Sequence, residues 1–319
     1  NVSKLALFVA AGMMTAGAQA ATIEIAEGTS MEIEGEFTSV YLLRDTVDTS
    51  VTGNEDNQDD LKGEIELSWS AVRSFDNFDA YTEATFEFAN QEEGGTGTDF
   101  DGAVAGLEGD FGQIEVGHTD SVYEDLITDS VDITEEAGLS YGSYGFDENN
   151  MLTYYSPETA GFSFRLQLGI EDEGEGTIDQ SDQGFIASAA YDFGAGAIHV
   201  GYDERGDTAG SDDSLTGIAA IFEVGMAEVS LAHEMETNAS DQDTDYTGLA
   251  ISYDYGAGKL YGAFQSESPD VGEDKSQYAF GISAELEDGI NVYAEYADFD
   301  GQTGSDKDTL VAVGLAYEF

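Results

Sequence analysis

The sequence predicts an all-β fold, a transmembrane antiparallel up-and-down β-barrel of about 16 strands. Three observations predict it. Apolar and charged residues alternate with period two along most of the chain, which is strand geometry because successive side chains point to opposite faces. The connections alternate between tight glycine turns and long acidic loops, a pattern typical of outer-membrane barrels. The last strand is amphipathic and ends in Phe319.

The alternation is clearest between residues 31 and 43. Ile33 and Phe37 share one parity, and Glu34 and Glu36 share the other. The same pattern recurs along the chain, although the parity of weakly apolar segments such as 215–223 is ambiguous. The predicted strands are 31–43, 61–69, 78–88, 100–108, 113–118, 150–155, 161–169, 183–193, 197–203, 215–223, 226–233, 246–255, 259–265, 277–286, 290–297 and 309–319.

Two sets of connections join these strands. Glycine in the tight set supplies the positive φ of short hairpin turns. The tight set comprises 108–112, 194–196, 224–225, 256–258 and 287–289. The long, acidic set comprises 44–60, 89–99, 119–149, 170–182, 204–214, 234–245, 266–276 and 298–308. We therefore expect short periplasmic turns at one end of the barrel and long acidic outer loops at the other.

Charge and composition exclude several classes of protein. The 319 residues include 67 Asp and Glu against 9 Lys and Arg, a formal net charge of −58, which excludes nucleic-acid binding through a basic surface. The absence of Cys excludes disulfide scaffolds and thiolate sites. A soluble β-sandwich also alternates. However, the apolar parity of the clearer strands carries no charge and the polar parity is strongly acidic, which favours the barrel.

Residues 1–20 have the features of a secretory signal peptide. Lys4 precedes the apolar run Leu5–Ala11, and Ala18-Gln19-Ala20 matches a small-residue cleavage site. The apolar run is too short to span a bilayer comfortably. We therefore expect an exported protein with a signal peptide at 1–20 and a single barrel domain at 21–319.

Two internal hairpins and the C-terminus resemble one family. The stretch 106–117 reads GLEGDFGQIEVG and the stretch 150–164 reads NMLTYYSPETAGFSF, and both resemble hairpins of Gram-negative general diffusion porins. The final strand, with Tyr317 and Phe319, resembles the assembly signal of bacterial outer-membrane proteins. The resemblance implies a sixteen-stranded barrel, usually a homotrimer, whose third loop, here 119–149, folds into the pore.

The same resemblance implies a function and a location. We expect a passive channel for ions and small hydrophilic solutes rather than an enzyme, in the outer membrane of a Gram-negative bacterium. Its expected partners are outer-membrane lipid, lipopolysaccharide, two further copies of the chain and the outer-membrane assembly machinery. The family usually has Arg where this chain has His118, and a basic residue where it has Thr153. The basic wall opposite the third loop is therefore depleted.

Carboxylates dominate both the third loop and the predicted lumen wall. Rings of carboxylates attract cations and repel anions, and a low-dielectric tube focuses their field, so we expect a cation-preferring channel. The predicted constriction residues in the third loop are Asp120, Glu124, Asp125, Asp129, Asp132, Glu135 and Glu136, and this loop also contains Asp147 and Glu148. The predicted residues of the lumen wall are Glu32, Glu34, Glu36, Lys62, Glu64, Glu66, Asp79, Glu83, Glu87 and Arg165.

Several alternatives stay open at this point. The acidity can instead serve solvation in a halophilic protein, since salt of about 1 M screens charges beyond about 3 Å, and this role is compatible with selectivity. Competing functions are a substrate-selective outer-membrane channel, a soluble acidic secreted β-protein of a halophile and a barrel enzyme. His118, His199 and His233 lack the spacing of a metal site. We expect no cofactor and no bound metal beyond loose divalent-cation binding by the acidic loops.

Overall fold

The computed structural model does not describe the whole chain. The predicted signal peptide and the loop acids Asp147 and Glu148 lie outside the described residues. The described residues are 23–48, 54–91, 95–138, 151–169, 184–205, 213–238, 240, 242–287, 289–299 and 307–319.

Seventeen strands run through the described residues, and none of the described segments forms a helix long and apolar enough to cross a membrane. The strands are β1 (Ile23–Ala26), β2 (Thr29–Asp48), β3 (Asn54–Ser74), β4 (Phe78–Gln91), β5 (Gly95–Gly109), β6 (Gly112–His118), β7 (Met151–Tyr155), β8 (Phe162–Gly169), β9 (Phe185–Asp192), β10 (Gly196–Arg205), β11 (Asp213–Val224), β12 (Ala227–Thr237), β13 (Asp243–Asp254), β14 (Lys259–Pro269), β15 (Lys275–Glu287), β16 (Ile290–Phe299) and β17 (Lys307–Glu318).

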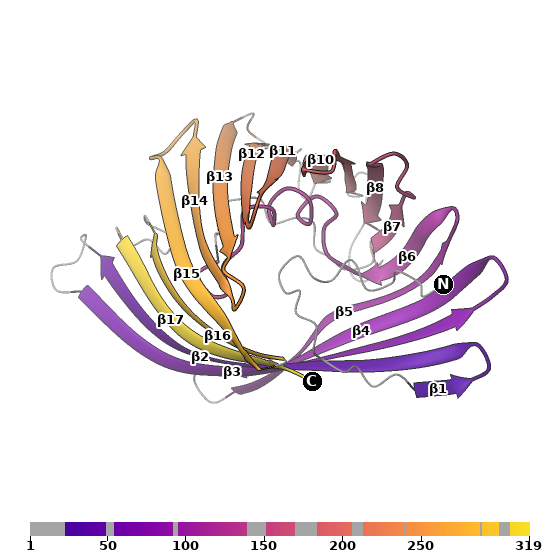
Figure 1. Ribbon diagram of the computed structural model, residues 1–319. Coiled ribbons are helices and arrows are strands. Elements are labelled where there is room, and N and C mark those ends of the chain that lie inside the picture. Colours follow the sequence, from indigo (N-terminus) through magenta and orange to yellow (C-terminus); the bar gives the residue numbers. More distant parts are fainter. Residues whose placement is uncertain are drawn as a thin grey trace, which may run out of the picture.

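Strands β2 to β17 close into an antiparallel barrel (Figure 1). Each strand pairs with the next one along the chain, and β9 pairs with β10 in the same way. The closing pair is β17 with β2, in a register that sets Val313 opposite Tyr41. The predicted fold class is therefore confirmed, and the sixteen strands of the barrel correspond to the sixteen predicted segments.

The short strand β1 was not predicted from the sequence. It forms a hairpin with β2 through Glu27 and Gly28, and Gly28 has the positive φ of 72° that this tight turn needs. β17 ends where Phe319 and Gly35 exchange backbone hydrogen bonds of 2.8 and 2.9 Å. β1 therefore pairs with the part of β2 that β17 does not reach.

The two faces of the barrel wall differ in burial. On the outward face Val313 is 55% exposed, and Ile33 and Phe37 are also exposed. On the lumen face the neighbouring residue Ala312 is fully buried. Glu34 stands at the lumen parity of β2. These exposures confirm the predicted parity of these strands. A slip of one residue would have reversed every assignment.

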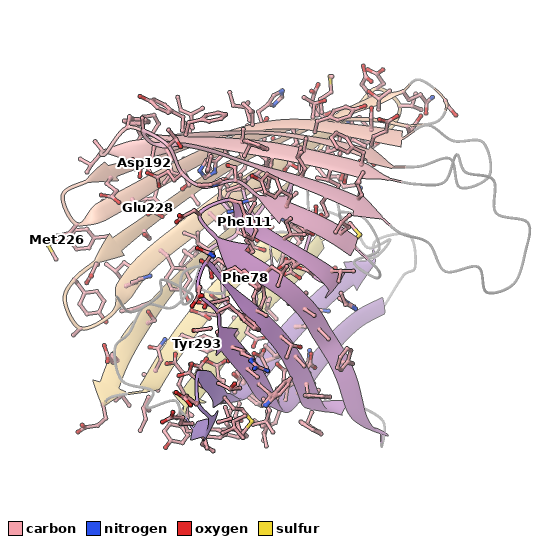
Figure 2. The ribbon with its side chains drawn as sticks, turned by 90° about the vertical axis from the view of Figure 1, so that its right-hand side faces the viewer. Phe78, Phe111, Asp192, Met226, Glu228 and Tyr293 are labelled. Atoms are coloured by element: carbon pink, nitrogen blue, oxygen red, sulfur yellow. The ribbon has the colours of Figure 1, made fainter. Side chains whose placement is uncertain are left out.

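The short turns lie at one end of the barrel, where Met226 marks the β11–β12 turn (Figure 2). In the β7–β8 turn Ala160 and Gly161 have φ of 55° and 83°, the signature of a type I′ hairpin. Thr159 and Phe162 exchange backbone hydrogen bonds of 2.9 and 3.1 Å around them. Such a two-residue turn adds few residues beyond the strand ends, so this connection at the end of the barrel is short.

The two faces can be separated chemically, because the chain has no native Cys. We expect single Cys at Glu34 or Glu66, on the lumen face, to react in intact membranes with a cationic, membrane-impermeant thiol reagent. Cys at Val313 or Leu315, on the outward face, should be spared. The reverse labelling pattern would place the register wrong by one residue.

Candidate functional site

The described part of the third loop, residues 119–138, lies inside the barrel (Figure 1). Its backbone winds in short turns. The Asp125 N–H donates to the Ser121 carbonyl at 3.1 Å, and the Ile127 N–H donates to the Tyr123 carbonyl at 2.9 Å. The loop is thus a compact insert with its own apolar side, not an extended strap.

The apolar side of the loop packs on glycines of the barrel wall. Tyr123 is fully buried and Val131 is 1% exposed. A Cβ on Gly201 would stand 2.5 Å from the Tyr123 ring, and one on Gly248 would stand 2.6 Å from Val131. A Cβ on Gly217 would overlap the Tyr123 hydroxyl. We call these three residues the glycine seat, because any other residue there would displace the loop.

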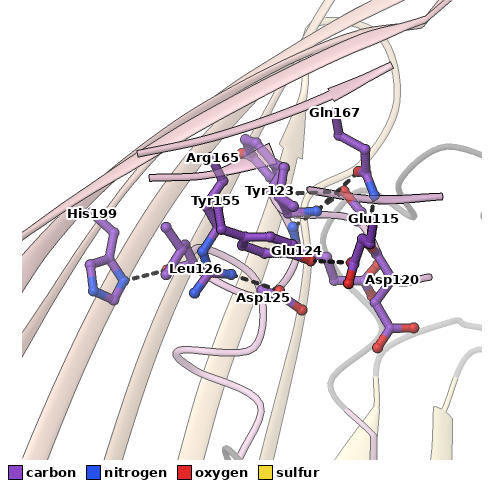
Figure 3. Close-up of polar contacts among 12 residues, drawn as sticks. Glu115, Asp120, Tyr123, Glu124, Asp125, Leu126, Tyr155, Arg165, Gln167 and His199 are labelled. Carbon is purple, nitrogen blue, oxygen red and sulfur yellow. Dashed lines mark hydrogen bonds and ion pairs between the residues drawn. The ribbon is translucent and has the colours of Figure 1, made fainter. Parts of the chain in front are cut away.

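Polar side chains of the wall fix the start of the loop (Figure 3). Gln167 on β8 donates its Nε2–H to the Asp120 carbonyl at 2.9 Å and accepts the Val122 N–H at 3.2 Å. His199 on β10 donates from Nδ1 to the Leu126 carbonyl at 2.7 Å, because a carbonyl can only accept. Both side chains therefore bind backbone rather than side chains of the loop.

An ion pair adds to these contacts. Arg165 Nη1 lies 2.7 Å from Oδ2 of Asp125, and its guanidinium stands 5.6 Å from the Tyr155 ring centre. The Tyr155 hydroxyl donates to Glu115 at 2.9 Å (Figure 3). The Tyr81 hydroxyl donates to the same carboxylate at 2.7 Å. Glu115 is 5% exposed. Its hydrogen bonds hold Tyr155 beside Arg165.

The middle of the loop is bound by Glu234 on β12. This carboxylate is 2% exposed and accepts hydrogen bonds from the Tyr123 hydroxyl at 3.1 Å and from Thr128 Oγ1 at 3.2 Å. Gly201, Gly217 and Glu234 are directly paired neighbours across β10, β11 and β12. The Tyr123 ring crosses the glycines and reaches the carboxylate at the end of their row.

The end of the described loop is bound by Glu295 on β16. Its carboxylate accepts three successive backbone N–H groups, those of Glu135, Glu136 and Ala137, at 2.7, 2.9 and 3.1 Å. It also accepts the Tyr261 hydroxyl at 2.7 Å. Glu295 is 3% exposed. Three loop donors and one wall donor thus bind this one buried carboxylate.

The loop carboxyls have raised pKa values. Burial, reinforced by the charge of Asp125, raises the pKa of Asp129 to about 7. Burial raises the pKa of Asp125 to about 6, although Arg165 opposes the shift. Partial desolvation of Glu135 inside the barrel and the charge of Glu295 raise the pKa of Glu135 to about 7. These carboxyls therefore change charge close to neutral pH, not near the ordinary value of about 4.

A row of glutamates crosses the wall formed by β17, β2, β3 and β4. Glu318 pairs with Glu36, Glu36 with Glu66, and Glu66 with Glu87. Like charges directly opposite each other on neighbouring strands repel. The loop contacts described above go to strands between β8 and β16, so this row lies on the remaining part of the wall.

The loop and this wall interact through their charges. The charge of Glu36 helps to raise the pKa of Glu135. Burial raises the pKa of Glu136, and Lys62 on β3 partly offsets this rise. Glu64 lies within electrostatic reach of Glu136. Carboxylates of the loop therefore face mainly carboxylates of the wall, with Lys62 among them.

The predicted site residues lie as follows, and their part in permeation stays a prediction. Asp120 and Glu135 are exposed, and the half-buried loop residues are Glu124, Asp125, Asp129, Asp132 and Glu136. The predicted wall residues at lumen parity on β2–β4 are Glu32, Glu34, Glu36, Lys62, Glu64, Glu66, Asp79, Glu83 and Glu87. Arg165 binds the loop instead of standing apart on the wall. Tyr317 and Phe319 are exposed on the outward face, with ring centres 5.8 Å apart.

Apart from Arg165, the wall residues that bind the loop were not predicted from the sequence. They are Gln167, His199, Glu234, Glu295 and the glycine seat. The available signal for Glu295 was a lone acid at lumen parity between Ala294 and Tyr296, and for the glycine seat it was glycine at lumen parity on β10, β11 and β13. Within the described residues, no group of three or more Asp, Glu or His side chains has the geometry of a metal site.

Replacing Glu295 tests the loop attachment. Glu295→Ala leaves three backbone N–H groups of the loop without their acceptor, so we expect a loss of about 3 kcal/mol in stability. The temperature at which the folded form converts on semi-native gels should fall, and single-channel conductance should rise as the loop end detaches. Glu285→Ala, an exposed acid on β15, is the matched control. An unchanged conductance in Glu295→Ala would contradict the attachment.

The chain resembles known channel proteins over most of its length. A family model described as Gram-negative porin matches residues 6–319. A monosaccharide porin from Halomonas sp is 28% identical over 216 residues, which cover 62% of this chain and 58% of that relative. The match thus spans less than two thirds of the relative's length.

Solved structures show the same fold. An anion-selective porin from Comamonas acidovorans has a TM-score of 0.74 at 17% identity, covering 91% of this chain and 100% of that chain. The OmpF complex with daunomycin from Salmonella typhi has a TM-score of 0.71 at 16% identity, covering 94% of this chain and 100% of that chain. With the closed barrel, the inserted loop and the family match, the chain belongs to the Gram-negative porin family, whose members are outer-membrane channels and not enzymes.

Proposed function

We propose that this passive outer-membrane channel prefers cations to anions, and that the preference arises where the third loop faces the glutamates of β2–β4. The observation that supports the proposal is that acidic residues of the loop face acidic residues of the wall across the lumen. Glu135 and Glu136 on the loop lie within electrostatic reach of Glu36 and Glu64 on the wall. A cation between two such groups is attracted from both sides.

The wall row strengthens the attraction for cations. Glu36, Glu66 and Glu87 repel each other because they are directly paired across the strands. A cation in the lumen relieves this repulsion, whereas an anion adds to it. The low-dielectric wall focuses the resulting field along the pore.

The positive groups near the loop do not reverse this balance. Arg165 forms an ion pair with Asp125, which reduces the field that it projects into the lumen. Lys62 stands beside the wall glutamates and acts on Glu136. Lys259 on β14 acts on Glu135. Among the described residues, these scattered cations do not form a basic wall opposite the loop.

A substrate-selective channel is the second candidate, and the relative named a monosaccharide porin favours it. The fold does not decide between the two, because the Comamonas acidovorans structure is named anion-selective and has the same architecture. Saturable block of single-channel current by one neutral sugar would support this candidate. The family assignment is incompatible with the third alternative, a soluble secreted β-protein.

Several further properties belong to this proposal. We expect a homotrimer, as a trimer form is named for the Vibrio cholerae OmpT structure, which has a TM-score of 0.64 at 14% identity. We also expect a cleaved signal peptide at 1–20, contacts with lipid and lipopolysaccharide, and insertion by the outer-membrane assembly machinery. Loose binding of divalent cations by the acidic loops and adaptation to high salt complete the proposal.

Neutralising the facing acids tests the origin of the preference. We expect Glu135→Gln with Glu136→Gln, or Glu36→Gln with Glu64→Gln, to lower the cation/anion permeability ratio by a factor of about 2 to 10. Reversal potentials across planar bilayers in a gradient of low salt measure the ratio. Glu158→Gln, in the β7–β8 turn, is the control that should keep it. A parental ratio in both double variants would show that the third loop does not form the selective constriction.

The preference should also depend on pH. The pKa values of Asp129 and Glu135 are raised to about 7, so both groups lose their charge as pH falls through neutrality. We expect the permeability ratio to decline with a midpoint between about 6 and about 7, and the decline to vanish at about 1 M salt. A midpoint near about 4 would mean that ordinary exposed carboxylates control the current.

A further inference from the structure

A tyrosine seated on a glycine recurs on the lumen face. Tyr261, Gly281 and Glu295 are directly paired neighbours on β14, β15 and β16. A Cβ on Gly281 would overlap the Tyr261 ring. The ring thus lies across the glycine, and its hydroxyl reaches the Glu295 carboxylate on the next strand at 2.7 Å. Because Gly281 has no side chain, the Tyr261 ring can lie over it. This position directs the Tyr261 hydroxyl towards Glu295.

The same arrangement occurs on the other side of the barrel. Tyr81, Gly106 and Glu115 are paired neighbours on β4, β5 and β6, and a Cβ on Gly106 would overlap the Tyr81 ring. The hydroxyl again donates to the carboxylate, at 2.7 Å. In both rows the acceptor belongs to the wall, so the tyrosine joins strands to each other.

Tyr293 has the same glycine but a different acceptor. It pairs with Gly314 on β17, and a Cβ there would overlap its ring. The next residue of that row is Val40, which offers no acceptor. The Tyr293 hydroxyl donates instead to Oε1 of Glu136 in the third loop, at 3.0 Å. Tyr293 is 5% exposed, so the packing around it holds the ring in place.

We propose that Tyr293 is a positioning residue for selectivity, which, seated on Gly314, holds the Glu136 carboxylate at a fixed place in the lumen facing Lys62. This inference rests on the proposed cation preference and names the residue that keeps one of its charges in place. The Glu295 hydrogen bonds fix the backbone of the loop at this point. Tyr293 fixes the side chain, which the backbone contact alone leaves free to rotate.

The groups around Glu136 determine how the Tyr293 hydroxyl affects the charge of this carboxyl group. Burial raises the pKa of Glu136 above its ordinary value, and the charge of Glu295 adds to this. The Tyr293 hydrogen bond and the charge of Lys62 pull the pKa back down. Glu64 on β3 also lies within electrostatic reach. Removing the hydroxyl should therefore make Glu136 lose its charge at higher pH.

Tyr293→Phe removes the hydroxyl and keeps the ring on Gly314. In the full-length channel, reversal potentials at low salt are measured from about pH 4 to about pH 9. We expect the part of the pH profile that Glu136 contributes to move up by about 1 pH unit, since a hydrogen bond to a charged group has about this effect. The midpoint of the cation/anion ratio should rise with it. Gly314→Ala, which displaces the ring, should shift the midpoint in the same direction.

Two further variants make the result specific. In a Glu136→Gln background Tyr293→Phe should have no additional effect, because the group on which it acts is gone. Tyr154→Phe is the matched control, as its hydroxyl donates to the Phe111 backbone carbonyl at 2.9 Å and touches no carboxylate. It should keep the parental midpoint.

The outcomes separate this inference from the proposed function. An unchanged midpoint in Tyr293→Phe, with or without a loss of heat stability, overturns the inference and leaves the cation preference standing. A shift of equal size in the Glu136→Gln background also overturns it, because Tyr293 would then act through another group. A parental channel without pH-dependent cation preference overturns the proposed function, and the inference with it.

Discussion

A carboxylate buried in a barrel wall needs hydrogen-bond donors, and here the third loop provides them. Taking a charge out of water is costly unless it is fully hydrogen-bonded. Glu295 is 3% exposed and receives three backbone N–H groups and one hydroxyl. The irregular backbone of the loop equally needs acceptors for its N–H groups. Wall and loop therefore satisfy each other, and the path through the barrel depends on this exchange.

The lumen thus contains two kinds of carboxylate with different roles. Glu115, Glu234 and Glu295 are almost completely buried and accept tyrosine hydroxyls, so their charge serves the architecture. Glu36 and Glu66 face each other on neighbouring strands at lumen parity. Their mutual repulsion is tolerable only in contact with water and counterions. A count of acids in the lumen would merge these two kinds, whereas their hydrogen bonds separate them.

The sequence predicts the barrel well because its signals are local. Alternation such as that of Ile33 with Glu34 sets the face of each residue, and turns such as Ala160-Gly161 set the register of the hairpins. β1 was missed because a four-residue strand carries too little alternation. The parity of 215–223 was ambiguous for a physical reason. Its lumen residues include Gly217 and Ala219, which are small because the loop packs on them.

The attachment of the third loop could not be predicted, because it joins residues far apart in the chain. Nothing near Glu295 in the sequence indicates that it binds residues 135–137. The loop's acids were identified from their number and from the resemblance that made 119–149 the third loop, not from their contacts. Which of them is held by Arg165, by Tyr293 or by neither depends on register across several strands. The order of the strands follows from local sequence patterns, whereas the attachment of the third loop in the lumen depends on contacts between distant residues.

The shared edge of β2 has a consequence for how the barrel assembles. β1 pairs only with the first residues of this edge. The later part of the edge pairs with β17, the twelve-residue strand that comes last in the chain. Contacts between segments so distant in sequence form slowly, since the intervening chain must be ordered first. Until then β2 presents a long row of unpaired backbone groups, which invites pairing with another chain. The nascent barrel is therefore most exposed to misassembly at its seam, and a chain that loses its last strand has no means of closing.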